Sequence, residues 1–282
     1  MSGSTRPSLR LRACSPRVEV MINGVSMYSG NVVLRFVRYV GELTLLLRTT
    51  LCQIFTPPFN AYRILSQAKR VGPGSFLIAS LVAFFIGMIM ALQMAYQMIA
   101  MSAEIYIPSV VAVSLTRELA PVLTSLIVAG RVGAGITAEI GTMTVTEQVD
   151  ALRAFAVNPV KYLVVPRFLG LILMLPVLTV FADLVGMMGG FVICVYKLYI
   201  SPTLYFTMIA EALTIKDIVT GLIKTVFFGA IIALVGCHQG LNVQSGAEGV
   251  GRSTTISVVI SFILIIAADC FFTAVFYFLF RV

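Results

Sequence analysis

The chain has 282 residues, of which 59% are hydrophobic and only 11% are charged, and its mean hydropathy is +1.00. Soluble domains carry about 25% charged residues, so this composition excludes an ordinary soluble protein and predicts an all-α integral membrane protein. The net charge of +8 does not indicate a nucleic-acid partner, because the basic residues lie in the N-terminal stretch and in short loops. Lipid headgroups and membrane orientation account for them better.

The N-terminal part of the chain is predicted to lie outside the bilayer core. Residues 1–27 contain four arginines and lack the apolar stretch of a secretory signal peptide, so we expect a basic, disordered tail. Between residues 28 and 60, charged residues recur among apolar ones at mixed three- and four-residue spacing, namely Arg35, Arg38, Glu42 and Arg48. This pattern favours an amphipathic helix that lies in the membrane interface.

Residues 61–282 are predicted to form a membrane domain of five spans. A bilayer core about 30 Å thick needs roughly 20 apolar residues per helix. Gly72-Pro73-Gly74 indicates a break just before the first apolar run. The runs that meet the length requirement lie at about residues 75–100, 110–135, 168–196, 218–237 and 256–280.

The distribution of basic residues predicts the orientation of these spans. With the N-terminus inside, ten Lys and Arg precede the first span, four lie between the second and third, and one lies between the fourth and fifth. Only three fall outside, and Arg117 and Lys224 lie within the membrane. The positive-inside rule therefore predicts a cytoplasmic N-terminus and an external C-terminus, in a cell inner membrane.

A short cytoplasmic helix is predicted between the second and third spans, at about residues 145–157. Thr144 stands three residues before Glu147, which is the spacing of a capping box, and Asn158-Pro159 would end the helix. The charged residues of this segment lie on one side and its apolar residues on another. The helix could press one face on the membrane domain and offer the other to a partner, or it could simply connect two spans.

Charged residues inside the predicted spans are the strongest indication of a site. They are Arg117, Glu118, Asp183, Lys224 and Asp269. Each costs about 2.5–3.5 kcal/mol at the centre of a membrane helix on insertion scales, so such residues usually face a protein interior or an aqueous cavity and pair there. Arg117, Glu118 and Lys224 favour a polar cavity for the headgroup of an amphiphile. Asp183 and Asp269 are equally consistent with a functional role and with interhelical pairing that fixes the packing of the helices.

The sequence indicates no catalytic centre, cofactor or metal. The segment GAEGVGRS, residues 246–253, imitates a phosphate-binding loop, but Arg252 stands where lysine is required and no strand precedes it. The cysteines are scattered without metal-binding spacing, and no His, Asp and Glu cluster resembles a hydrolytic site. We therefore expect a non-catalytic protein.

Three segments of the sequence resemble the MlaE permease family, which is also called YrbE. They are RELAPVLTSLIVAGRVGAGITAEIGTMTVTEQVDAL from residue 117, NPVKYLVVPRF from residue 158 and GVGRSTTISVV from residue 249. The resemblance covers roughly residues 61–280. Members of this family are membrane subunits of ABC-type lipid transporters that work with MCE-domain proteins.

The resemblance implies a permease that moves phospholipid or another lipid between the inner membrane and the outer envelope. It implies a second permease copy, identical or related, a cytoplasmic ABC ATPase dimer docked on the short helix, and a ring of MCE-domain subunits on the outer side. In the family, the Arg-Glu pair and the fourth-span lysine are associated with the lipid cavity, and they match Arg117, Glu118 and Lys224. Contact with the ATPase is expected from Glu139, Glu147, Gln148, Asp150 and Arg153. Related permeases also occur in the plastid envelope.

Two other functions remain open on the residues alone. An ion-coupled secondary transporter or channel would act without an ATPase and would use the buried carboxylates to carry protons. It fits less well because no internal inverted repeat is evident. A passive scaffold for a lipid-carrying ring would leave the intramembrane charges without a role.

Overall fold

The computed structural model describes residue 34 and residues 37–54, 61–244 and 246–280. The chain divides into two compact units, Met1–Leu45 and Leu46–Val282. Within the predicted interfacial segment, residues 37–54 are helical, and Arg38 pairs with Glu42 one turn later at 3.0 Å. The predicted tail, residues 1–27, lies outside the described residues.

The described part of the chain is built from helices joined by short turns, without a strand. Five of these helices are long and apolar enough to cross a membrane, at Tyr62–Ile99, Glu104–Val145, Val160–Tyr196, Ile215–Leu241 and Gly246–Phe278. The prediction of an all-α membrane protein with five spans is therefore confirmed. Each helix begins before the apolar run that revealed it, because helical hydrogen bonding continues past the hydrophobic stretch into polar residues.

The first span is a single long helix, α2 (Ala61–Ile99), which continues through Pro73. The predicted break at Gly72-Pro73-Gly74 was therefore wrong. The helix makes its most extensive contact with α7 (Val165–Tyr196), and Gly72 packs against Met174 of that helix. The absence of a side chain at Gly72 makes room for the neighbouring helix, so packing outweighs the low intrinsic helix propensity of this tripeptide.

The second span is longer than predicted and contains two π-helical turns. It consists of α3 (Ile107–Ser114), a π-helical turn Leu115–Leu119, α4 (Ala120–Val128), a second π-helical turn Ala129–Gly133 and α5 (Ala134–Val145). Such turns insert one extra residue into a helix and re-aim the side chains that follow. The first turn contains Arg117 and Glu118, and the second contains Arg131.

The predicted connecting helix exists as α6 (Gln148–Ala154), but its proposed capping box was wrong. The hydroxyl of Thr144 donates to the carbonyls of Ile140 and Gly240, at 2.9 and 3.1 Å, because α5 runs on to Val145 and Thr144 belongs to its last turn. Glu147 occupies the left-handed region, with φ of 58°, and makes no side-chain cap. The chain thus reverses sharply at Glu147 before α6 begins.

The fourth and fifth spans are α9 (Ile215–Leu241) and α10 (Gly246–Phe280). Residues 246–253, whose spacing resembles that of a phosphate-binding loop, form the first turns of α10. Within the bundle, α9 is the most buried span and packs on α5, α7 and α10, whereas α10 is the least buried.

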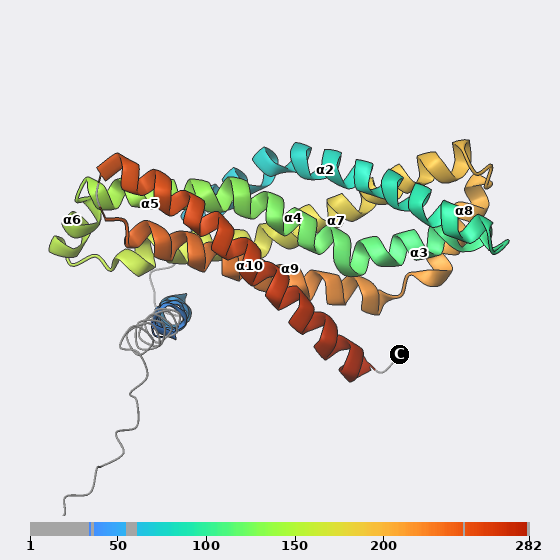
Figure 1. The fold of residues 1–282 in the computed structure, drawn as a ribbon. Helices are drawn as coiled ribbons and strands as arrows, with labels where there is room; N and C mark the ends of the chain where they lie inside the picture. The colour runs from blue at the N-terminus through green and yellow to red at the C-terminus, as the bar shows by residue number, and fades with distance from the viewer. Residues whose placement is uncertain (1–33, 35–36, 55–60, 245, 281–282) are drawn as a thin grey trace, which may run out of the picture. The chain divides into compact units, whose positions relative to one another are not determined.

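An additional short helix, α8 (Pro202–Ala212), was not predicted. The side chain of Ser201 accepts a hydrogen bond from the backbone N–H of Leu204, at 3.3 Å, and Pro202 occupies the first helical position. This Ser-Pro pair is a helix-start signal that the sequence carried. Figure 1 shows α8 and α6 at opposite ends of the membrane bundle.

Candidate functional site

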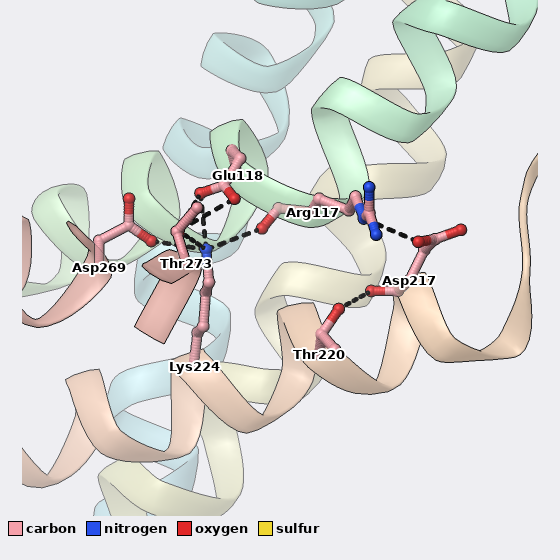
Figure 2. Close-up of polar contacts among 7 residues, drawn as sticks. All are labelled: Arg117, Glu118, Asp217, Thr220, Lys224, Asp269 and Thr273. Atoms are coloured by element: carbon pink, nitrogen blue, oxygen red, sulfur yellow. Dashed lines mark hydrogen bonds and ion pairs between the residues drawn. The ribbon is translucent and has the colours of Figure 1, made fainter. Parts of the chain in front are cut away.

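The ammonium group of Lys224 lies at the centre of a buried polar network between three helices (Figure 2). Its four acceptors are Glu118 Oε2 at 2.6 Å, Thr273 Oγ1 at 2.7 Å, Asp269 Oδ1 at 2.9 Å and the Arg117 carbonyl at 3.3 Å. An ammonium has three N–H donors, so these four acceptors saturate it. The paired and hydrogen-bonded arrangement offsets the cost of burying a lysine whose side chain is only 2% exposed.

Pro121 helps to explain why a backbone carbonyl joins this network. Proline has no N–H to donate to the carbonyl four residues earlier, and in this helix that carbonyl belongs to Arg117. Lys224 donates to the same carbonyl from α9. The π-helical turn and the proline together therefore expose a backbone acceptor inside the bundle.

Arg117 points away from Lys224 and pairs with a different carboxylate (Figure 2). Its Nε lies 2.8 Å from Oδ1 of Asp217, near the start of α9. The other oxygen of Asp217 accepts hydrogen bonds from the backbone N–H and the hydroxyl of Thr214, at 2.9 and 2.7 Å, which completes a capping box. Because the ion pair is made through Nε, the two terminal nitrogens of the guanidinium keep their donors, within the described part of the chain, for another acceptor.

A pocket of about 530 Å³ lies beside these two ion pairs. Charged and hydroxyl side chains form one part of its wall, namely Arg117, Glu118, Thr214, Lys216, Asp217, Thr220, Lys224 and Thr273. The remaining wall is apolar and comes from Val113, Ala212, Phe276 and Tyr277. Its volume is that of a small-molecule site. A polar headgroup with an adjoining apolar segment matches this division of the wall.

The structure brings the three predicted cavity residues, Arg117, Glu118 and Lys224, to this one pocket. It adds Asp217 and Thr273, which the sequence analysis missed. The Thr214-x-x-Asp217 spacing was a visible helix-start signal, but it gave no reason to connect Asp217 with Arg117. Thr273 is a single hydroxyl in an apolar run, and only the packing of α10 against the second span reveals that it donates to Glu118 at 3.1 Å.

The two remaining intramembrane carboxylates behave differently. Asp269 forms an interhelical ion pair with Lys224. Asp183 is buried on α7, and among the described residues its Oδ1 has no hydrogen-bond partner. Within the same part of the chain, no three His, Cys, Asp or Glu side chains gather in a way that could hold a metal ion.

The residues predicted to contact an ATPase fall into two groups. Glu147, Gln148, Asp150 and Arg153 are exposed at the turn that contains α6, and Asp150 pairs with Arg153 at 2.9 Å. Val149 of the same helix is buried against the membrane domain, so α6 has one packed face and one exposed, charged face. Glu139 lies apart from them, half-buried on α5 between Arg70 and Arg167.

Five membrane-length helices with a charged pocket between them define a multi-pass α-helical membrane protein whose interior can receive a polar group. The family described as Permease MlaE matches residues 64–275, and the chain belongs to this family.

Several relatives carry transporter names. The chain is 41% identical over 253 residues to a probable ABC transporter permease protein of Rickettsia typhi, covering 90% of this chain and 98% of the relative. It is 45% identical over 212 residues to a protein of the same description from Synechocystis, covering 75% and 81%. It is also 38% identical over 213 residues to the chloroplastic protein TRIGALACTOSYLDIACYLGLYCEROL 1 of Arabidopsis thaliana, covering 76% and 61%.

Proposed function

We propose that this protein is the permease subunit of an ABC-type lipid transporter and that its 530 Å³ pocket receives a phospholipid headgroup. The observation that carries the proposal is the exposure and hydrogen bonding of Arg117. Its side chain is 45% exposed at the pocket, is fixed through Nε by Asp217 and, among the described residues, keeps both terminal nitrogens for an acceptor. Guanidinium groups bind phosphate through two parallel hydrogen bonds, so a phosphodiester is the ligand that suits it.

Lys224 has a different role in this proposal from the one that the resemblance implied. Its donors are already taken by carboxylate, hydroxyl and carbonyl oxygens, so it has none to offer a lipid phosphate. We assign to Lys224 the positioning of Glu118, whose side chain is 41% exposed and lines the pocket. The Glu118 carboxylate can then meet the positive part of a zwitterionic headgroup while Arg117 binds its phosphate.

The second span offers a mechanical link between this pocket and α6. Arg117 and Val145 are 28 positions apart on one unbroken helical segment, which corresponds to about 42 Å at 1.5 Å per residue. In the proposed mechanism, an ATPase dimer docks on the exposed face of α6 and pushes this segment when it closes on ATP. The second π-helical turn, Ala129–Gly133, lies between the two sites and can absorb a change of register.

The partners belong to the same proposal. The names of the Rickettsia and Synechocystis relatives support an ATPase partner, and the name of the Arabidopsis relative, which contains that of a lipid, supports a lipid substrate. A second permease copy and a ring of MCE-domain subunits would complete the transporter. The proposed location is the inner membrane with a cytoplasmic N-terminus; the chloroplastic relative makes a plastid envelope the alternative.

A lipid-capture experiment tests this proposal. The full complex is reconstituted, a photoactivatable phosphatidylcholine is added, and crosslinking and lipid transfer are measured for wild type, Arg117→Gln and Arg117→Lys. We expect Arg117→Gln to lower capture at least tenfold, since a hydrogen-bonded charge pair contributes about 1.5–3 kcal/mol, and Arg117→Lys to fall between the two. Lys197→Gln, at the exposed end of α7, is the matched charge control.

Two results would overturn the proposal. Wild-type capture and transfer by Arg117→Gln would remove the headgroup assignment. Ion-gradient-driven flux from the purified permease alone, with no dependence on an ATPase, would instead support the secondary transporter.

A further inference from the structure

A second cluster of charges lies near the α6 end of the bundle, and the proposed function does not use it. Glu139 of α5 pairs with Arg70 of α2 at 2.8 Å and with Arg167 of α7 at 3.2 Å. Both guanidinium groups contact the same oxygen, Oε2. One carboxylate therefore shares its charge between two cations that come from different helices.

Two further arginines lie beside this group. Arg131 donates from a terminal nitrogen to Ser75 Oγ at 3.2 Å, and its guanidinium lies against Gly74, where a side chain would displace it. The guanidinium of Arg63 lies 3.8 Å from the centre of the Tyr162 ring. Among the described residues, neither Arg131 nor Arg63 pairs with a carboxylate. Four arginines and one glutamate leave an excess of three positive charges.

Two hollows flank Glu139 and are lined by these arginines. One of about 190 Å³ is lined by Arg70, Arg131 and Glu139 together with Gln67. The other, of about 240 Å³, is lined by Arg63, Glu139 and Arg167 together with Tyr162. Each has room for several water molecules, and therefore for a phosphate group.

Arg167 supplies an independent indication that an acceptor is missing. Its side chain is 5% exposed, and within the part of the chain that the structure describes its buried Nε has no hydrogen-bond partner. Buried side-chain donors are nearly always satisfied in native proteins, by protein, water or a bound group. An anion at the cluster would provide the missing acceptor and offset the excess positive charge.

We propose that this arginine cluster binds the phosphate of an anionic phospholipid, at a site separate from the Arg117 pocket. Arg131 lies 14 positions after Arg117 on the same helical segment, about 21 Å away along its axis. The two sites can therefore be occupied at the same time by different lipid molecules.

The surface of α2 indicates a lipid rather than a protein carboxylate. With 39 residues this helix is about 58 Å long, whereas a bilayer core is about 30 Å thick, so part of α2 extends to headgroup level. From Gly74 the same helical face continues at four- and three-residue spacing through Ile78, Leu81 and Phe85, which are 46%, 57% and 52% exposed. An acyl chain can lie along this apolar face while its phosphate contacts the arginines above it.

Lipid counting on the full-length permease tests the site. In an Arg117→Gln background, which removes the first headgroup contact, short-chain phosphatidylglycerol, phosphatidylcholine and inorganic phosphate are titrated separately and bound molecules are counted by native mass spectrometry. We expect phosphatidylglycerol to bind more tightly than phosphatidylcholine. Arg70→Gln combined with Arg131→Gln should lower phosphatidylglycerol affinity at least tenfold, since each basic residue near anionic lipid contributes about fivefold.

Two further variants distinguish the position of the Arg131 guanidinium from the overall positive charge of the protein. Gly74→Ala keeps every charge but places a methyl group where the Arg131 guanidinium lies, and it should weaken phosphatidylglycerol binding several-fold. Arg252→Gln removes an exposed charge on α10 and should change binding less than twofold. If the double arginine variant elutes as an aggregate, Arg131→Lys takes its place, with an intermediate loss expected because lysine lacks the bidentate fork.

Three outcomes would overturn the proposal. The first is wild-type phosphatidylglycerol binding by a monodisperse double variant. The second is binding of inorganic phosphate as tight as that of phosphatidylglycerol, which would indicate a free-phosphate site. The third is unchanged lipid binding with lost co-purification of an ATPase subunit, which would indicate that the arginines dock a protein carboxylate. None of these bears on the Arg117 pocket, so the two proposals fail separately.

Discussion

Lys224 and Glu118 are joined at 2.6 Å, yet their side chains are 2% and 41% exposed. The cation is buried within the helices while its anionic partner reaches the pocket. Because a buried ammonium depends on its carboxylate partners far more than a half-exposed carboxylate depends on its cation, removing the carboxylates should affect the fold more than removing Lys224.

Glu118→Gln combined with Asp269→Asn removes both carboxylates and leaves the buried ammonium of Lys224 without an anionic partner. Breaking a buried pair in this way costs about 3–5 kcal/mol, so we expect a free energy of unfolding lower by that amount in detergent-solubilised permease. The measurement is a denaturant titration followed by fluorescence or circular dichroism.

A compensated variant gives the control for this prediction. Lys224→Met combined with Glu118→Gln and Asp269→Asn leaves no charge unpaired, and it should recover at least half of the lost stability. A variant with both carboxylates replaced that is as stable as wild type would contradict the structural role that we assign to these ion pairs.

The membrane spans and the cavity charges were predictable from the sequence because both signals are local. An apolar run or a charge within one can be recognised without knowing what it packs against, which is why Arg117 and Lys224 stood out. Asp217 did not, because a carboxylate one turn into a helix already has a role in capping. Only the approach of α9 to the first π-helical turn makes it the partner of Arg117.

The errors of the sequence analysis have the same origin. A Gly-Pro-Gly tripeptide weakens a helix locally, but contact with α7 and with the Arg131 guanidinium keeps α2 continuous there. Thr144 and Glu147 have capping-box spacing, but the preceding helix extends over Thr144 and takes its hydroxyl. In each case tertiary packing decided between two locally acceptable structures.

The contact between α2 and α7 depends on glycine at Gly87. A side chain there would meet the carbonyl oxygen of Gly186, which is backbone and cannot move aside. We expect Gly87→Ala to destabilise the permease by about 1–3 kcal/mol, measured by the same denaturant titration. Gly251→Ala is the matched control, because α10 leaves open space at that position. It should be neutral or up to about 1 kcal/mol more stable, since alanine is the better helix former.

At the turn before α6, the effect of the Glu147 charge can be tested separately from the effect of its backbone conformation. Glu147 has a φ of 58°, which costs a non-glycine residue about 1–2 kcal/mol and costs glycine almost nothing. Glu147→Gly should therefore fold at least as stably as wild type while lacking the carboxylate. If α6 docks an ATPase through this charge, Glu147→Gly and the double variant Glu147→Lys with Asp150→Lys should both lower ATPase co-purification and lipid-stimulated ATP hydrolysis. Unchanged assembly and hydrolysis in both would exclude these two charges from the coupling.

In the proposed headgroup site, the charge of Asp217 would repel the lipid phosphate, although its carboxylate fixes Arg117 through Nε. At an effective dielectric constant of about 20, a unit charge roughly 6 Å from the phosphate contributes about 2–3 kcal/mol, reduced by solvent because the Arg117 side chain is 45% exposed. We therefore expect Asp217→Asn to strengthen capture of the photoactivatable lipid about three- to tenfold. The gain should shrink as salt is raised, and lipid transfer should slow because release becomes harder.

Thr214→Ala is the control for this prediction. It removes one hydrogen bond to the Asp217 carboxylate but keeps the charge, so its capture should match wild type. Weaker capture by Asp217→Asn would show that the carboxylate contributes more by orienting Arg117 than it costs by its charge.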